Sequence, residues 1–522
     1  MAETIGAEDA KILIHGDHEI ALLDVREHGQ YGNGHPFFAV PMPYSRLELR
    51  APVLLPRKTV PIILVDDGDG VGERAAKALA DIGYTDIRVL DGGAPAWAAA
   101  GFELFEGVNV PSKTFGELVE HDLQTPSITA AELSAMADAG DDFILLDGRT
   151  PEEYQRFNIP GGISCPNAEL PYRIDHMVAE PKTTVVINCA GRTRSIIGAQ
   201  GLINFGLANR VVALENGTQG WCLAGFKLEH GADRFHPTEL PAAAVEQARA
   251  RATDVAERFA VPIITRQTLD GWREDAERSL YILDVRGRQE FLSGHVPGAG
   301  HAPGGQLVQA TDQWVAVRGA RIVVTDDTEV RAIVAAHWLR QMGHDAHVLQ
   351  GVLQGVIASG PLEVGPETGV TIETSLPTVT VTELKVMIAS GEATVLDLRP
   401  GMDFRAGHIP GAVWSLRPRI GDHTGTIVLV ADEPEIAALA AAEIGEAALL
   451  DGGFQAWRSA GMEIEATPDS PSDGDCIDHL FFTSGRHDGI EAAMHAYLNW
   501  EIGLVDQIDS QERAAFHIVA PD

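Results

Sequence analysis

The chain has 522 residues, and 75 acidic against 39 basic residues give it a formal net charge of −36 at pH 7. A field this negative repels phosphate backbones and anionic lipid surfaces, which argues against nucleic-acid or membrane partners for the whole chain. No stretch approaches about 18 consecutive apolar residues. The first residues are acidic where a signal peptide needs a basic and then an apolar region, so we expect a cytoplasmic protein. The length suggests about three to five domains.

The cysteines limit the chemistry that the chain can carry. There are only four, Cys165, Cys189, Cys222 and Cys476, which is too few for a secreted disulfide framework. No CxxC pair offers a zinc site, and the histidines show no paired ligand spacing. We therefore expect no metal and no cofactor, and any cysteine chemistry must come from a single thiol.

One strand ending, an apolar run closed by Leu-Asp-x-Arg, recurs four times along the chain, at Asp24, Asp147, Asp284 and Asp397. An Ile/Val-Pro-Gly turn follows it in the last three copies, and a looser HPFFAVPMP segment follows it in the first. A second apolar run comes later in each copy. The count from the aspartate to the residue after that run is 42 in the first three copies and 34 in the fourth. These are four copies of one domain.

The predicted elements have the same order in each copy. An amphipathic helix precedes the Leu-Asp-x-Arg strand, and the second apolar run predicts another strand. Alanine-rich helices follow at 73–83, 195–206, 330–343 and 435–445. A short strand and a Gly-rich turn, at 90–97, 214–221, 349–356 and 450–457, close each copy. Strands alternating with helices predict an α/β fold, with a parallel sheet flanked by helices in each of four tandem domains.

The predicted domains span residues 1–107, 126–232, 262–362 and 376–466. Polar or proline-containing stretches near 108–125, 232–262, 362–376 and 467–475 predict the boundaries, and residues 240–260 predict a linker helix between copies two and three. Residues 467–522 form an acidic linker and a tail. The linker, TPDSPSDGD, has a composition typical of disorder. Apolar residues at helical spacing over 490–508 predict a helix that docks on a neighbouring domain.

Only the second copy has a cysteine where the second strand passes into its helix, in the segment INCAGRTRS. The backbone N–H groups and the dipole of a helix N-terminus stabilise an anion, so we expect Cys189 to be a thiolate at neutral pH. Gly191 permits the loop to curl, and Arg192 and Arg194 add charge that a bound anion could share. Residues 181–214 contain four basic and no acidic residues. This basic segment in an acidic chain predicts an anion site.

The equivalent positions of the other copies are Asp66, Asp326 and Ala431. None is a nucleophile. Acidic residues follow at all three positions, and carboxylates in a loop that would otherwise hold an anion repel that anion. We therefore interpret copies one, three and four as inactive.

The repeated strand ending, the HxPGA turn, the cysteine loop and the Gly-Gly-x-x-x-Trp closing turn together resemble the rhodanese (sulfurtransferase) family, over about residues 10 to 465. The resemblance implies that Cys189 takes the outer sulfur of a donor such as thiosulfate and holds it as a persulfide. A thiophilic acceptor, cyanide or a thiol, then removes it. The loop residues that would bind the substrate are Ala190, Gly191, Arg192, Thr193, Arg194 and Ser195.

Two other functions stay open at this stage. The chain could be a non-catalytic sulfur-relay or interaction scaffold, since three copies have already lost the cysteine. It could also be a cysteine-dependent phosphatase or arsenate reductase, although Asn188 and Ser195 stand where such phosphatases have His and Arg. We expect Cys165 and Cys222 to be packed as small hydrophobic residues. Cys476, in a polar linker, is the remaining candidate for an accessible thiol that accepts the persulfide.

Overall fold

A computed structural model describes residues 2–178, 180–351, 363–365, 372, 374–421, 423 and 425–520. The chain divides into two compact units, one made of residues 1–11, 21–107 and 369–482, the other of residues 12–20, 108–368 and 483–522. The first unit holds copies one and four, and the second holds copies two and three with the tail. Among the residues described, no helix has both the length and the apolar character that a bilayer crossing requires.

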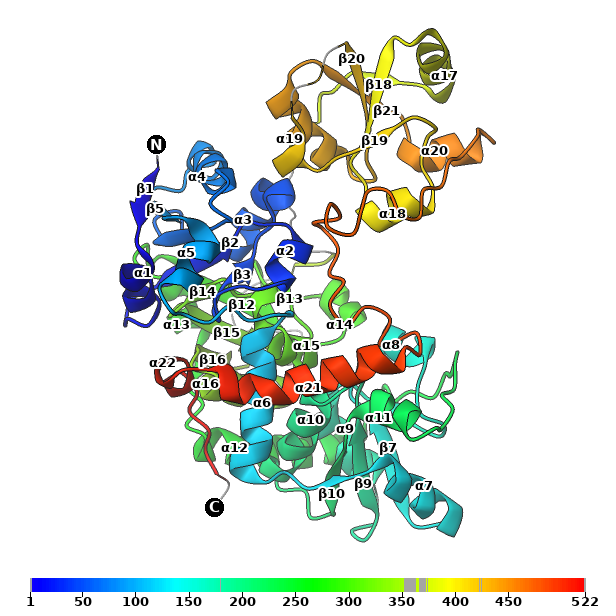
Figure 1. The fold of residues 1–522 in the computed structure, drawn as a ribbon. Helices are drawn as coiled ribbons and strands as arrows, with labels where there is room; N and C mark the ends of the chain where they lie inside the picture. Colours follow the sequence, from blue (N-terminus) through cyan, green and yellow to red (C-terminus); the bar gives the residue numbers. More distant parts are fainter. Residues whose placement is uncertain are drawn as a thin grey trace. The chain divides into compact units, whose positions relative to one another are not determined.

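Each copy forms its own parallel sheet, as the alternating pattern predicts (Figure 1). In every copy the strand that ends in Leu-Asp-x-Arg pairs with the strand that leads to the Cys189 position. Because the strands are parallel, their carboxyl ends meet at one edge of the sheet, so the repeated Asp and Arg lie beside the loop.

The strand order of copy one is β1-β5-β4-β2, with β3 also paired to β2. Its elements are β1 (Glu3–Ile5), α1 (Ala7–Ile14), β2 (Ile20–Asp24), α2 (His28–Gly32), β3 (Val40–Pro41), η1 (Tyr44–Arg46), α3 (Leu47–Leu54), β4 (Ile62–Val65), α4 (Val71–Asp81), β5 (Ile87–Leu90) and α5 (Gly93–Ala99).

Copy four has the order β17-β21-β20-β18-β19. Its elements are β17 (Thr378–Val379), α17 (Val381–Ser390), β18 (Ala393–Asp397), α18 (Gly401–Ala406), β19 (Val413–Trp414), η3 (Arg417–Arg419), β20 (Thr426–Val430), α19 (Pro434–Ile444), β21 (Ala447–Leu450) and α20 (Gly453–Ser459).

Copy two has the order β6-β10-β9-β7-β8. Its elements are β6 (Ser127–Ile128), α7 (Ala130–Ala139), β7 (Phe143–Asp147), α8 (Pro151–Arg156), β8 (Ile163–Ser164), α9 (Glu169–Met177), β9 (Thr184–Asn188), α10 (Thr193–Asn204), β10 (Val211–Leu214) and α11 (Gly217–Leu223). Apolar residues of α9 and α10 pack on one face of the sheet, and those of α7 and α11 pack on the other.

Copy three has the order β11-β16-β15-β12-β13. Its elements are β11 (Ile263–Ile264), α13 (Arg266–Arg273), β12 (Leu280–Asp284), α14 (Arg288–Ser293), β13 (Gly300–His301), α15 (Gly304–Gln309), η2 (Thr311–Gln313), β14 (Val317–Arg318), β15 (Arg321–Thr325), α16 (Val330–Gln341) and β16 (Asp345–Leu349). The predicted closing turn at 349–356 and the predicted boundary at 362–376 lie largely outside the described residues.

Within the described residues, the helices outside the copies are α6 (Val110–Leu123), α12 (Ala242–Arg258), α21 (Glu491–Gln507) and α22 (Ser510–Ala514). Helix α12 is the predicted linker helix. Helix α6 occupies the stretch 108–125, where the sequence predicts only a boundary. The predicted tail helix is α21, and it packs against α6 and α11 (Figure 1). The prediction that the tail docks on a neighbouring domain is therefore confirmed.

Candidate active site

Cys189 lies between β9 and α10, where the sequence predicts a strand passing into a helix. The residue is 2% exposed, so its thiol is enclosed by the surrounding loop and its neighbours. The Ser195 hydroxyl donates a hydrogen bond to Cys189 Sγ over 3.1 Å. A sulfur anion at this position has a hydroxyl donor and the first turn of α10 beside it, as anion stabilisation requires.

Helix α11 fixes the outer side of the loop. The backbone N–H of Thr218 donates to the Cys189 carbonyl over 2.8 Å, and that of Gln219 donates to the Ala190 carbonyl over 3.2 Å. Gly217, which precedes them, has a φ of +52°, and a Cβ atom there would lie 2.2 Å from the Cys189 carbonyl oxygen. This close approach explains why the closing turn of the repeat needs glycine.

The two loop arginines are already paired with carboxylates. Arg192 donates to both oxygens of Glu117 over 2.8 and 2.9 Å, and it also bonds Glu120, the second acidic residue of α6 that reaches it. Arg194 donates to both oxygens of Glu153 over 2.6 and 2.7 Å. Two of the four basic residues of this segment are therefore neutralised by acidic residues from other segments, and both guanidinium groups already have carboxylate partners.

A fourth carboxylate comes from the tail. Glu501 of α21 is fully buried, and its Oε1 accepts from the backbone N–H of Thr193 over 3.4 Å, from the Thr193 hydroxyl, and from the Lys113 ammonium over 3.1 Å. Burial alone would raise the pKa of Glu501, but the Lys113 charge and these hydrogen bonds lower it, so the group is ionised. Glu501 therefore accepts the hydrogen bond of one backbone N–H in the first turn of α10, which a bound anion could otherwise accept.

Gly191 is a second point of contact between the loop and the tail. A Cβ atom on Gly191 would lie 2.9 Å from Tyr497 Cε1 and 3.2 Å from Glu501 Oε2. That Oε2 atom is buried and has no hydrogen-bond partner within the described residues. The sequence suggests that Gly191 lets the loop curl. Its φ is not in the left-handed region, and the structure instead requires glycine because the tail packs directly against the loop.

The repeated Asp and Arg form the same contact in every copy. Arg149 Nε and Nη2 bond the Asp147 carboxylate, and Nη2 also donates to the Phe157 carbonyl over 2.6 Å. Equivalent bonds join the arginine and aspartate of the other three copies. These residues hold the turn that follows the strand, so their role is shared by copies with and without the cysteine.

Copies one and three fill the Cys189 position with an aspartate that bonds its own loop. In copy one, Asp66 accepts the backbone N–H groups of Gly68 and Gly72, each over 2.9 Å. In copy three, Asp326 accepts the backbone N–H of Arg331 over 3.1 Å and the Thr328 hydroxyl over 2.9 Å. An internal carboxylate thus uses the donors that would hold an external anion.

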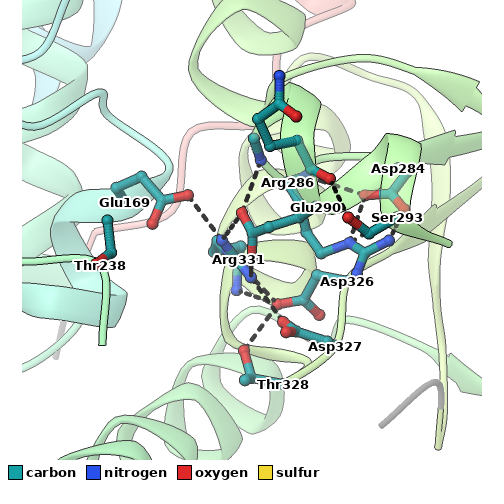
Figure 2. Close-up of polar contacts among 12 residues, drawn as sticks. Glu169, Thr238, Asp284, Arg286, Glu290, Ser293, Asp326, Asp327, Thr328 and Arg331 are labelled. Carbon is teal, nitrogen blue, oxygen red and sulfur yellow. Dashed lines mark hydrogen bonds and ion pairs between the residues drawn. The ribbon is translucent and has the colours of Figure 1, made fainter. Parts of the chain in front are cut away.

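Figure 2 shows the surroundings of Arg331 in copy three, with Asp326 and Asp327 beside it. Arg331 is fully buried and donates to Glu290 over 2.9 and 3.0 Å and to Glu169 of α9 over 2.8 Å. Arg331 stands five residues after Asp326, as Arg194 stands five after Cys189, and Glu290 corresponds to Glu153. The Arg194–Glu153 pair therefore recurs in a copy that has no thiol.

The other cysteines differ in part from expectation. Cys165 is fully buried, as predicted, whereas Cys222 is half-buried and lines a pocket. The prediction that Cys476 is accessible is wrong, because this residue is only 1% exposed. Hydrogen bonds from Arg405 to the Pro471 carbonyl and from the Gly401 N–H to Asp478 hold the linker against α18 and cover the thiol.

The chain belongs to the rhodanese family. The Rhodanese-like domain model matches it four times, over residues 7–100, 129–224, 265–358 and 380–460, which together make up well over half of its length.

Three relatives illustrate what the chain is similar to. A thiosulfate sulfurtransferase from Pseudomonas aeruginosa, known from its crystal structure, is 40% identical, with a TM-score of 0.90 and full coverage of both chains. SseB of Mycobacterium tuberculosis, which carries the name of a thiosulfate sulfurtransferase, is 32% identical over 127 residues, or 22% of this chain and 43% of SseB. An HTH-type transcriptional regulator of the same organism is 27% identical over 200 residues, or 36% of this chain and 85% of the regulator.

The four carboxylates around the loop were not predicted from the sequence. Glu117 and Glu120 lie in a stretch that reads as a domain boundary, and Glu501 lies in the tail. The one available signal was the helical apolar spacing of the tail, which predicted docking but not where the helix docks. Glu153 belongs to a capping box with Thr150 at the start of α8, and this local contact accounts for the residue without a partner in the loop.

Proposed function

We propose that Cys189 carries sulfane sulfur as a persulfide, and that the protein moves this sulfur from thiosulfate or a related donor to a thiophilic acceptor. The protein is a sulfurtransferase by family and by its full-length likeness to a solved thiosulfate sulfurtransferase. The observation that carries the assignment to Cys189 is its place at the N-terminus of α10, with the Ser195 hydroxyl 3.1 Å from its sulfur.

The reaction needs two displacements at sulfur. The Cys189 thiolate attacks the outer sulfur of thiosulfate, the sulfur–sulfur bond of the donor breaks, and sulfite leaves with the bonding electron pair. The Ser195 hydroxyl and the N–H groups at the start of α10 stabilise the negative sulfur that results. An acceptor then attacks the outer sulfur of the persulfide, and the electron pair returns to Cys189 as a thiolate.

In our proposal, copies one, three and four do not carry out this reaction. Asp66 and Asp326 cannot carry sulfur, and each already bonds the donors of its own loop. All four cysteines of the chain are free thiols. That state suits the reducing cytoplasm, where we place the protein.

Intact-mass spectrometry of the full chain after incubation with thiosulfate tests the proposal. We expect the mass of one added sulfur on the wild type and on Cys222→Ser, and none on Cys189→Ser. Retention of the sulfur by Cys189→Ser would refute the assignment to this thiol. No sulfur on the wild type with any donor would favour a non-catalytic scaffold.

A further inference from the structure

A pocket of about 600 Å³ lies in copy two, and the reaction described above leaves it without a role. Three segments of chain line it: the end of α8, helix α11 with the segment after it, and the tail from Arg486 into the first turn of α21. The lining residues that matter here are Arg156, Gln219, Lys227, Arg486, His487 and Asp488.

The pocket shares a wall with the Cys189 loop. The Gln219 side-chain amide donates to the Ala190 carbonyl over 3.2 Å, and a Cβ atom on Gly191 would lie 3.4 Å from Gln219 Nε2. On the tail side, the Arg486 guanidinium lies 4.7 Å from the centre of the Tyr497 ring, which packs against Gly191. A molecule in this pocket is therefore separated from the loop backbone by single side chains.

The lining carries more positive than negative charge. Arg156 is paired with Asp488 over 2.8 Å, which leaves Lys227 and Arg486 as a surplus in a chain whose net charge is −36. Three buried polar atoms of the lining have no hydrogen-bond partner among the described residues, namely Gln219 Oε1, Arg486 Nε and His487 Nδ1. Buried polar groups without partners are rare in folded proteins and are expected to be met by a ligand or water.

We propose that this pocket binds the sulfur acceptor, and that the acceptor is a small thiol that carries carboxylate groups. The inference rests on the proposed function of Cys189. Lys227 and Arg486 bind the carboxylates, and the thiol reaches toward the loop past Gln219. The acceptor thiolate bonds the outer sulfur of the persulfide, and the bond from that sulfur to Cys189 Sγ breaks. The electron pair returns to Cys189, the proton that the acceptor thiol gives up on ionising passes to the transferred sulfur, and no external oxidant or reductant is needed.

Steady-state sulfur transfer by the full chain, with thiosulfate as donor, tests the proposal with two acceptors. Mercaptosuccinate carries two carboxylates, and 2-mercaptoethanol carries none. The variants are Lys227→Gln and Lys227→Gln/Arg486→Gln. The matched control is Lys182→Gln, which removes an exposed cation of the same copy that does not line the pocket. Persulfide loading of Cys189 by thiosulfate is measured separately for each protein.

The double variant removes both charge-assisted contacts to the carboxylates, so we expect it to raise KM for mercaptosuccinate at least about tenfold. KM for 2-mercaptoethanol and the persulfide loading should stay unchanged, and Lys182→Gln should match the wild type throughout. An equal change for both thiols, or no change for either, would overturn the acceptor site. Absence of persulfide on the wild type would instead overturn the function on which the site rests.

Discussion

At the scale of single residues, Arg149 differs from its counterpart in copy one by one contact. Arg26 Nη1 donates to Asp67 over 2.9 Å, and Asp67 is the residue directly after the Cys189 position of that copy. Copy two has Ala190 there, and Arg149 Nη1 is buried with no hydrogen-bond partner among the described residues. The copy with the thiol thus leaves a guanidinium N–H unmatched at the base of its loop.

Ala190→Asp should therefore make copy two resemble copy one. The new carboxylate should pair with Arg149 and place a negative charge next to Cys189, which weakens the binding of an anionic donor. We expect persulfide loading from thiosulfate to fall at least about tenfold, since a nearby unit charge contributes a few kcal/mol. Stopped-time intact-mass measurements give the rate. Ala190→Asn is the control of equal size, and an equal loss in Asn and Asp variants would refute the electrostatic cause.

Arg194 is a second residue whose contacts differ from expectation. The sequence suggests that it shares the charge of a bound anion, but it pairs with Glu153, and the same pair recurs as Arg331–Glu290 in copy three. Burial would raise the pKa of Glu153, but the Arg194 charge outweighs it and lowers that pKa to about 2. A carboxyl whose folded pKa is depressed contributes stability above its unfolded pKa. That contribution is lost as the pH falls through the folded value.

Arg194→Met should accordingly lower the free energy of unfolding by roughly 1–3 kcal/mol at pH 7, less than for a fully buried pair because Glu153 is 37% exposed. The difference from the wild type should shrink as the pH falls from about 4.5 toward 2. Urea unfolding at several pH values measures it. A surface control is Lys77→Met, whose pair with Asp81 is exposed. A stability difference that did not change with pH would contradict the ion pair as its source.

At the scale of elements, the loop between the second strand and its helix is where the copies diverge. Asp326 in copy three is buried, burial raises its pKa to about 6, and it bonds the first turn of α16. Around it, Arg331 is held by Glu290, Glu169 and Asp327. The interior of this loop is a closed network of side chains rather than an open anion site.

Asp326→Cys, made in a Cys189→Ser chain, should therefore gain little sulfur from thiosulfate. The new thiol would lack the Asp326 bonds to α16, and the remaining carboxylates would repel the donor. Replacing residues 326–332 with 189–195 should load more, because that segment brings the Ser195 hydroxyl. Intact mass gives the sulfur content of both. Full loading of the single Asp326→Cys variant would show that loss of the nucleophile alone silences copy three.

The sequence predicted the alternating strands and helices that the four copies share, and it placed Cys189 where a strand passes into a helix. The repeated Leu-Asp-x-Arg strand has one register in three copies, and only copy two has a cysteine at the strand-to-helix junction. The sequence did not predict which charged groups lie around that thiol. The groups that meet Arg192 and Thr193 stand 75, 72 and 308 residues away along the chain. Pairing over such separations depends on how helices pack, which local patterns do not encode.

At the scale of the whole unit that holds copies two and three, the tail completes the enclosure of the thiol. Helix α21 brings Tyr497 and Glu501 to the loop, and α6 brings Lys113 to both of them. The loop cations and Lys113 are thus balanced by carboxylates from α6, α8 and α21. A negatively charged donor must therefore enter a site whose cations are already neutralised by carboxylates of the protein.

Removing the tail carboxylate should make the loop more receptive to anions. We expect Glu501→Gln to raise the rate of persulfide formation from thiosulfate by about tenfold, because the charge that competes for the Thr193 N–H is lost while the side chain keeps its shape. Glu491→Gln, at the exposed start of α21, should leave the rate unchanged. A chain that ends after Gly489 should also show faster alkylation of Cys189 by iodoacetamide than a chain that ends after Ile508, which keeps α21. A slower thiosulfate reaction in Glu501→Gln would mean that this carboxylate shapes the loop for catalysis instead of competing with the donor.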